Sequence, residues 1–234
     1  MKLIQRQGYL DFLRRNRNRP IVKVVSGIRR CGKSTLFRLF KDELLSEGIK
    51  PEQIISINFE ELEYEHLREY HALYQYILER MQPDEMNYIF LDEIQHVDQF
   101  HRVVDSLFVK ENTDLYITGS NAYFMSSNIA TLLTGRYVEI QMLPLSFSEF
   151  YYSKFDGNQY SLIPAYESYL RESSFPYTQQ LGGEDFDIQE YLRGLYNTLL
   201  LHDVVARLKI SDVTILQDIV RYIMSNIGSL LSPN

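Results

Sequence analysis

Residues 26–35 of the chain, SGIRRCGKST, carry residue types whose spacing suits the binding of a phosphate. Gly27 and Gly32 bracket four residues and allow the backbone to curl, so that successive N–H groups point at phosphate oxygens. Lys33 can reach the β- and γ-phosphates of a nucleotide, and the Ser34 hydroxyl can ligate Mg²⁺. The segment matches the pattern G-x-x-x-x-G-K-[ST] at every fixed position, and it therefore predicts a phosphate-binding loop.

The whole loop is expected to contact the nucleotide, mainly through backbone N–H groups. The residues concerned are Gly27, Ile28, Arg29, Arg30, Cys31, Gly32, Lys33, Ser34 and Thr35. Cys31, the single cysteine of the chain, lies beside a predicted helix N-terminus and two arginines, an environment that lowers the pKa of a thiol. A redox-sensitive thiol is one interpretation. We favour the other, a small filler whose N–H binds phosphate.

An acidic pair ends the apolar run NYIFLDE at residues 87–93. Such a run is typical of a buried strand, and side chains at the carboxyl end of a parallel strand lie where ligands bind. Asp92 is expected to hold Mg²⁺ directly or through water, and Glu93 to orient and deprotonate an attacking water. The alternative is an acidic strand end that only caps the next helix.

Polar side chains also occur where the predicted strand at 114–120 ends, at Thr118, Ser120 and Asn121. Each of them could contact a γ-phosphate or the attacking water, and a polar turn is an equally good interpretation of any one of them. Arg136 comes just before the last predicted strand. It could stabilise the charge that develops at the γ-phosphate, in its own subunit or in a neighbour, or it could be a surface arginine.

These residues lie at the ends of predicted strands. Strands are expected at 21–27, 53–60, 87–93, 114–120 and 137–143, the last at a sheet edge, with helices at 3–16, 33–48 and 64–81 among them. Strands that alternate with helices predict an α/β fold, a parallel sheet with helices on both faces. Further helices are expected at 165–173, 187–210 and 213–228. We therefore expect a nucleotide-binding domain at 1–150 and a helical lid or linker region at 151–234.

The composition indicates a folded, soluble protein of a reducing cytoplasm. Of the 234 residues, 45% are hydrophobic, which supports a core. The sequence contains no run of about 18 apolar residues, so no transmembrane helix is expected. A single cysteine excludes an internal disulfide framework and a multi-cysteine zinc site. The net charge of −7 conceals an asymmetry, because residues 1–41 carry twelve of the 24 basic residues and one of the 31 acidic ones. Such a split can mark a nucleic-acid face, although we favour nucleotide contacts and solvated surface.

Four stretches together resemble a family of bacterial and archaeal AAA-type ATP-binding proteins: KVVSGIRRCGKSTL, YIFLDEIQHV, LYITGSN and LLTGRYVEIQMLPLSFSEF. The resemblance runs from about residue 5 to the C-terminus. It implies a P-loop ATPase sheet with strand order 5-1-4-3-2, in which the strand at 114–120 lies between the loop strand and the Asp-Glu strand. It also implies ATP rather than GTP, and the sequence contains no Asn-Lys-x-Asp guanine-reading motif.

The resemblance also implies roles for individual residues. It implies phosphate binding by residues 27–35, Mg²⁺ binding by Ser34 and Asp92, water activation by Glu93, and a γ-phosphate contact by Arg136. Members of the family continue into a C-terminal domain that is thought to be winged-helix-like. The chain is therefore expected to be a C-terminally shortened form with an incomplete C-terminal domain.

The leading functional hypothesis is Mg²⁺-dependent ATP hydrolysis, coupled to a conformational switch that acts on an unidentified macromolecular partner. The alternative is a nucleotide-gated DNA- or protein-binding module with negligible turnover, and the basic stretch Arg14–Arg19 motivates the DNA version. A small-molecule kinase is disfavoured, because a water-activating glutamate such as Glu93 serves hydrolysis and not transfer to another acceptor. Turnover is expected to need an arginine from a partner or a neighbouring copy, which makes a homo-oligomer a candidate state.

Overall fold

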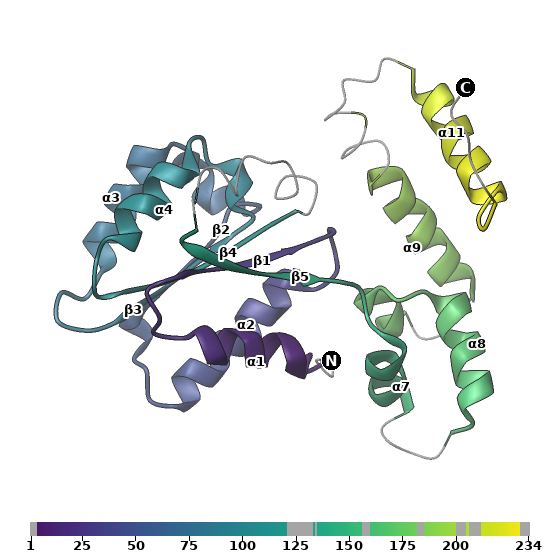
Figure 1. Cartoon of the computed structure of the whole chain (residues 1–234), viewed down its shortest axis with the longest axis horizontal. Coiled ribbons are helices and arrows are strands. Elements are labelled where there is room, and N and C mark those ends of the chain that lie inside the picture. The colour runs from purple at the N-terminus through teal and green to yellow at the C-terminus, as the bar shows by residue number, and fades with distance from the viewer. Residues whose placement is uncertain are drawn as a thin grey trace. The chain divides into compact units, whose positions relative to one another are not determined.

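The computed structural model describes residues 4–120, 133, 135–155, 160–181, 185–199, 205 and 212–229. The chain divides into two compact units, Met1–Gln180 and Leu181–Asn234. The first unit contains the sheet and the helices around it, and the second contains α9 (Asp185–Asn197) and α11 (Val213–Ser225) (Figure 1). Among the helices of the described residues, none is long and apolar enough to cross a membrane.

A five-stranded parallel sheet forms the centre of the first unit. Its strands are β1 (Val22–Gly27), β2 (Ile54–Asn58), β3 (Asn87–Asp92), β4 (Thr113–Ser120) and β5 (Tyr137–Met142). They lie side by side in the order β2-β3-β4-β1-β5, and every neighbouring pair is parallel. This order confirms the predicted 5-1-4-3-2 arrangement, with β4 between β1 and β3 and with β5 at an edge.

Helices cover both faces of the sheet (Figure 1). One apolar layer joins α1 (Gln7–Asn16) and α2 (Lys33–Ser46) to the sheet, and the other joins α3 (Tyr70–Arg80) and α4 (Phe100–Phe108) to the opposite face. Successive strand residues point to opposite faces, so Val24 packs in the second layer and Val25 in the first. All six residues of β1 and of β3 are buried, as expected of central parallel strands.

Aromatic packing fixes α2 on its face of the sheet. The rings of Phe90 on β3 and Tyr116 on β4 stack with their centroids 4.6 Å apart. Phe37 and Phe40 of α2 meet these rings, and the Phe37–Phe90 centroid distance is 5.2 Å in an edge-on arrangement. Because α2 begins at Lys33, this packing also holds the end of the phosphate loop in place.

A buried ion pair joins β1 and β4 near their amino ends. Lys23 and Asp114 are both fully buried, and the Asp114 carboxylate also accepts hydrogen bonds from the Tyr116 hydroxyl at 2.7 Å and from the Asn18 N–H at 2.9 Å. Burial lowers the pKa of Lys23, against the opposing effect of Asp114. The pair lies near the amino-terminal ends of the strands, away from the loop, so we assign it to stability rather than to chemistry.

Short helical segments complete the first unit. The 3₁₀ turns are η1 (Pro51–Gln53), η2 (Leu62–Arg68), η3 (Ile94–His96) and η4 (Pro176–Gln180), and the remaining helices are α7 (Phe147–Phe155) and α8 (Leu162–Glu172). The boundary predicted at residue 150 lies inside α7 and inside the first unit. One contact that ties α7 to the sheet domain is the ion pair between Arg6 and Glu149, at 2.9 Å.

Candidate functional site

The predicted phosphate loop connects the carboxyl end of β1 to the first turn of α2. A Cβ atom on Gly27 would lie 2.3 Å from the Met142 carbonyl oxygen on β5 and 2.9 Å from the Cys31 sulfur, so only glycine fits there. Gly32 precedes α2 with φ +107°, a backbone conformation that favours glycine. Both glycines are therefore required by the path of the loop, as the sequence predicted.

The side chain of Cys31 points into the protein. It is fully buried and packs among the apolar side chains between α2 and the sheet. Burial raises the pKa of the thiol, and the opposing effects of Lys33 and Arg6 do not reverse this. The expectation of a lowered pKa at Cys31 was therefore wrong, because proximity to positive charge was outweighed by desolvation. The filler interpretation agrees with the structure.

Lys33 lies at the centre of the site. Its ammonium group is within hydrogen-bond distance of the Gly27 carbonyl at 3.1 Å and the Ile28 carbonyl at 3.4 Å, and it pairs with Glu93 Oε1 at 3.0 Å. The side chains of Lys33 and Glu93 are 3% and 6% exposed, so little water screens the pair. The three contacts match the three hydrogens of an ammonium group.

Asp92 is a buried carboxylate surrounded by hydroxyl groups. The Thr118 hydroxyl on β4 donates a hydrogen bond to Asp92 Oδ1, and the Ser34 hydroxyl is also hydrogen-bonded to this carboxylate. Burial raises the pKa of Asp92, and the two hydroxyls oppose the effect. A nearby cation would stabilise the ionised carboxylate, and oxygen donors are those that Mg²⁺ prefers. Asp92 and Ser34 therefore form a donor set that fits the expected metal ion.

Glu93 adopts a left-handed backbone conformation directly after β3, with φ 54° and ψ 48°. This conformation costs roughly 1–2 kcal/mol for a residue other than glycine. Its N–H donates to the Thr118 hydroxyl at 2.9 Å, and its side chain accepts from the amide of Gln95 as well as from Lys33. The turn at Glu93 thus brings the carboxylate back over the phosphate loop.

Strand register explains why these residues meet. Gly27 of β1 lies opposite Ser120 of β4, and Asp92 of β3 lies opposite Asn58 of β2, so the carboxyl ends of the four strands share one edge of the sheet. The backbone of Ser120 is therefore at the loop edge, as the sequence predicted. Asn121 lies outside the residues that the structure describes. The roles predicted for Ser120 and Asn121 stay predictions.

Arg136 lies at the amino-terminal end of the strands, on the side of the sheet opposite the phosphate loop. It immediately precedes β5, whose first residue, Tyr137, pairs with Val22 at the start of β1. Five residue steps along β5 separate Tyr137 from Met142 beside the loop, roughly 17 Å. The Arg136 guanidinium pairs with Asp105 of α4 at 3.5 Å. The interpretation that Arg136 contacts a phosphate in its own subunit was therefore wrong, and action in a neighbouring subunit stays a prediction.

Two residues contribute to the site in ways that the sequence did not assign. Thr118 was recognised as polar, but its link to both Asp92 and Glu93 depends on the pairing of β3 with β4. The available signal was a polar residue inside an apolar strand. Gln95 follows the acidic pair by two positions, and although it lies in the stretch YIFLDEIQHV that carries the family resemblance, no role was assigned to it.

Arg6 is the third residue whose role was missed. Its guanidinium donates to the Cys31 carbonyl at 3.2 Å and to the Leu143 carbonyl at 2.6 Å, and it binds both carboxylate oxygens of Glu149. It is 5% exposed, which is unusual for arginine. Arg6 therefore joins the segment before α1, the loop backbone and the start of α7.

A cavity of about 1080 Å³ adjoins the loop on the side of Arg6. Its lining includes loop residues, the segment before α1, β5, α7 and η4, among them Ile4, Cys31, Gly32, Thr35, Met142, Tyr152 and Pro176. The lining mixes apolar side chains with polar and charged ones, a combination that suits a ligand with both an apolar face and polar groups. The cavity lies within the first unit of the chain.

Comparison with known proteins identifies the family. A family model described as an AAA domain matches residues 19–151, which is more than half of the chain. A curated relative from Haemophilus influenzae, described as an uncharacterized protein, is 37% identical over 99% of this chain and 58% of its own length. The chain spans about half the length of the curated relatives it matches.

Two solved structures share the fold. The Walker-type ATPase of Pyrococcus abyssi has a TM-score of 0.58 and 16% identity, over 89% of this chain and 77% of that protein. The ORC1 protein of Aeropyrum pernix, solved in complex with DNA, has a TM-score of 0.51 and 13% identity, over 87% and 68%. Both agree with a P-loop ATPase sheet followed by helices. From the family match and from the loop, sheet order and acidic pair, the chain belongs to the AAA domain family.

Proposed function

We propose that the chain binds ATP with Mg²⁺ and hydrolyses it, and that the nucleotide state switches the conformation of the protein. One observation carries the proposal: the buried ion pair between Lys33 of the phosphate loop and Glu93. In this pair the residue that we propose to bind phosphate, Lys33, lies 3.0 Å from the residue that we propose as the general base, Glu93, beside the carboxylate of Asp92. A surface turn with incidental charges would not bury these groups together.

Each residue has a distinct role in the proposed reaction. Ser34 and Asp92 would hold Mg²⁺, which supplies charge neutralisation at the phosphates. Lys33 binds the β- and γ-phosphates, and backbone N–H groups of the loop bind the remaining oxygens. Glu93 orients a water molecule and takes its proton while the water oxygen bonds to the γ-phosphorus and the bond to the ADP oxygen breaks.

The cavity beside the loop is the proposed place for the base and ribose. It begins at Cys31, Gly32 and Thr35, where a nucleotide bound by its phosphates would leave the loop. Apolar walls from Met142 and Tyr152 suit the faces of a base.

The proposed switch uses the contacts of Arg6. Its hydrogen bonds connect the loop backbone at Cys31 to Glu149 in the first turn of α7. A change of loop conformation on nucleotide binding would therefore change the position of α7 through these contacts.

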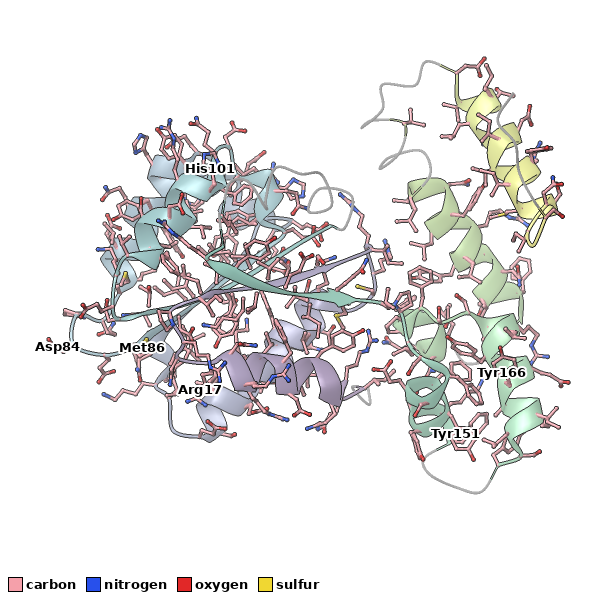
Figure 2. All side chains as sticks on the ribbon, viewed as in Figure 1. Arg17, Asp84, Met86, His101, Tyr151 and Tyr166 are labelled. Atoms are coloured by element: carbon pink, nitrogen blue, oxygen red, sulfur yellow. The ribbon has the colours of Figure 1, made fainter. Side chains whose placement is uncertain are left out.

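The macromolecular partner of the proposed ATPase stays DNA or protein. The basic stretch that motivated DNA binding is partly neutralised, because Arg14 pairs with Glu43 of α2 and Arg17 pairs with Glu47, which directly follows α2 (Figure 2 labels Arg17). These pairs fasten α1 to α2, so the stretch gives less support to DNA than its composition suggested. The DNA-bound neighbour shares only the fold of this chain.

ATP binding and turnover should be measured on the wild type and two variants. Lys33→Ala should abolish ATP binding, because the phosphates lose their buried cation, whereas Glu93→Gln should keep binding and lose hydrolysis. The exposed glutamine on α3, Gln75, provides a neutral control as Gln75→Ala. Equal turnover in the wild type and Glu93→Gln would contradict the assigned base. If the wild type binds ATP but hydrolyses none, whether or not DNA is present, the result would favour the binding-module alternative.

A further inference from the structure

Both oxygens of the Glu93 carboxylate are engaged. Oε1 pairs with the Lys33 ammonium group at 3.0 Å, and Oε2 accepts a hydrogen bond from the side-chain amide of Gln95. Glu93 is 5% exposed, so water contributes little to holding the carboxylate. Two neighbours, one on the loop side and one on η3, therefore determine where the carboxylate points.

The two contacts have different fates in the proposed reaction. Lys33 is the residue that binds the β- and γ-phosphates, so ATP competes with Glu93 for it. When Lys33 turns to the phosphates, Oε1 becomes free on the side that faces the loop, which is where the attacking water must lie. Gln95 carries an uncharged amide on η3 that donates to the Glu93 carboxylate, so the arrival of phosphates does not remove this contact.

The turn that carries Gln95 is well placed to hold Glu93. The His96 N–H donates to the Glu93 carbonyl at 3.2 Å and closes the turn, which brings the Gln95 side chain back toward the carboxylate. A carboxylate can only accept hydrogen bonds, so the amide must present its NH₂ group. The amide oxygen of Gln95 is buried and has no hydrogen-bond partner within the described part of the chain. Within the described part of the chain, the side-chain amide of Gln95 is therefore held by Glu93 and by no partner of its oxygen.

We propose that Gln95 is the positioning residue of the catalytic base: its side-chain NH₂ group fixes Oε2 of Glu93, so that Oε1 points at the attacking water once ATP has drawn Lys33 away. This inference rests on the proposed function. It adds a residue that acts through Glu93 and touches neither the nucleotide nor the metal ion. In the resting state the same contact keeps the carboxylate on Lys33, so the base is occupied until phosphates arrive.

Two substitutions of equal length test the role of Gln95. Gln95→Met removes the donor, and Gln95→Glu replaces it with a second carboxylate that repels Glu93. Both should lower kcat, roughly ten- to a hundredfold for the loss of a hydrogen bond to a charged group, and leave the Kd for ATP within about twofold. Gln75→Met and Gln75→Glu, on an exposed face of α3, are the matched controls and should change neither value.

A double-mutant cycle distinguishes positioning from a merely structural role. Glu93→Asp shortens the carboxylate by one methylene and withdraws it from Gln95, and its residual turnover is the background for the second substitution. If Gln95 acts through Glu93, Gln95→Met lowers kcat in the wild type and adds no further loss in Glu93→Asp. A structural role would lower kcat by the same factor in both, together with the melting temperature.

The outcomes separate the inference from the proposed function. Full turnover in Gln95→Met and Gln95→Glu, with Glu93→Gln inactive, would overturn the role of Gln95 and leave Glu93 as the base. Equal losses in both backgrounds of the cycle would also overturn it. If the wild type turns over ATP no faster than Glu93→Gln does, both the role of Gln95 and the role of Glu93 as the base are overturned. Thermal melts of all variants check folding, and an unfolded Gln95→Met leaves Gln95→Glu to decide.

Discussion

Replacing Thr118 by valine should separate the two acidic residues of the site from the strand that holds them. The Thr118 hydroxyl donates to the Asp92 carboxylate and accepts the N–H of Glu93, so one group satisfies two buried polar neighbours. Valine has nearly the same shape and no hydroxyl. The substitution therefore tests hydrogen bonding with little change in packing.

The expected loss of stability follows from the hydrogen bonds that Asp92 and Glu93 keep without the Thr118 hydroxyl. Asp92 keeps the Ser34 hydroxyl but loses a hydrogen bond to a charged group, worth about 1.5–3 kcal/mol. The Glu93 N–H, in a residue that is 5% exposed, loses its acceptor, which costs about 1–3 kcal/mol. Because the strained turn at Glu93 can relax, we expect the free energy of unfolding to fall by about 3 kcal/mol in total.

Urea denaturation and amide hydrogen exchange measure the two consequences. The Glu93 N–H should exchange much faster in Thr118→Val, and ATP·Mg²⁺ should bind more weakly because Asp92 and Glu93 are less well held. Thr118→Ser keeps the hydroxyl and should retain binding, losing only about 1 kcal/mol with the buried methyl group. Thr198→Val, at an exposed hydroxyl, is the control. A loss below about 1 kcal/mol in Thr118→Val, with unchanged exchange at Glu93, would refute the reasoning.

Three further predictions concern the sheet, the neighbouring subunit and the acid stability of the α7 contact. Asp114→Ala leaves buried Lys23 unpaired and should lower the free energy of unfolding by about 3–5 kcal/mol. Lys23→Met with Asp114→Leu should recover only part of this loss in urea denaturation, because the Tyr116 hydroxyl and the Asn18 N–H also lose their acceptor. Arg136→Ala should lower turnover only at protein concentrations where chains associate; an equal loss in dilute monomer would contradict action on a neighbour. Burial raises the pKa of Glu149, but hydrogen bonds from Arg6 and Ser146 prevail and hold it below its ordinary 4.5. The stability from this ionised carboxylate is present above about pH 4.5 and lost as pH falls below it, so thermal melts should show a shallower acid decline in Glu149→Gln.

The fold was predictable because its signals are local. Apolar runs predicted all five strands, and each described strand lies at or within two residues of its predicted bounds. The order of the strands came from the family resemblance, since periodicity alone does not say which strands are neighbours. The helical region after residue 150 was also predicted, but the extent of the first unit was not, because it depends on contacts such as Arg6 with Glu149.

Arg136 illustrates a signal that was present and not used. A residue before a parallel strand lies at the amino edge of the sheet, and a residue after it lies at the carboxyl edge with the ligand. Arg136 precedes β5, so its distance from the phosphate loop followed from its position in the sequence. Cys31 is different: whether burial or nearby charge decides the pKa of its thiol depends on which way the side chain points, and packing alone determines that.

The sequence by itself determined the phosphate loop and the acidic pair, because a glycine spacing and an apolar strand with an acidic end act over a few neighbouring residues. Only the tertiary structure decided how the two work together. The register of β3 and β4 brings Thr118 to Asp92 and Glu93, and the left-handed turn at Glu93 brings its carboxylate to Lys33 and Gln95. These contacts join residues that lie far apart in the chain or on either side of a sharp turn, so their geometry exists only once the strands have paired.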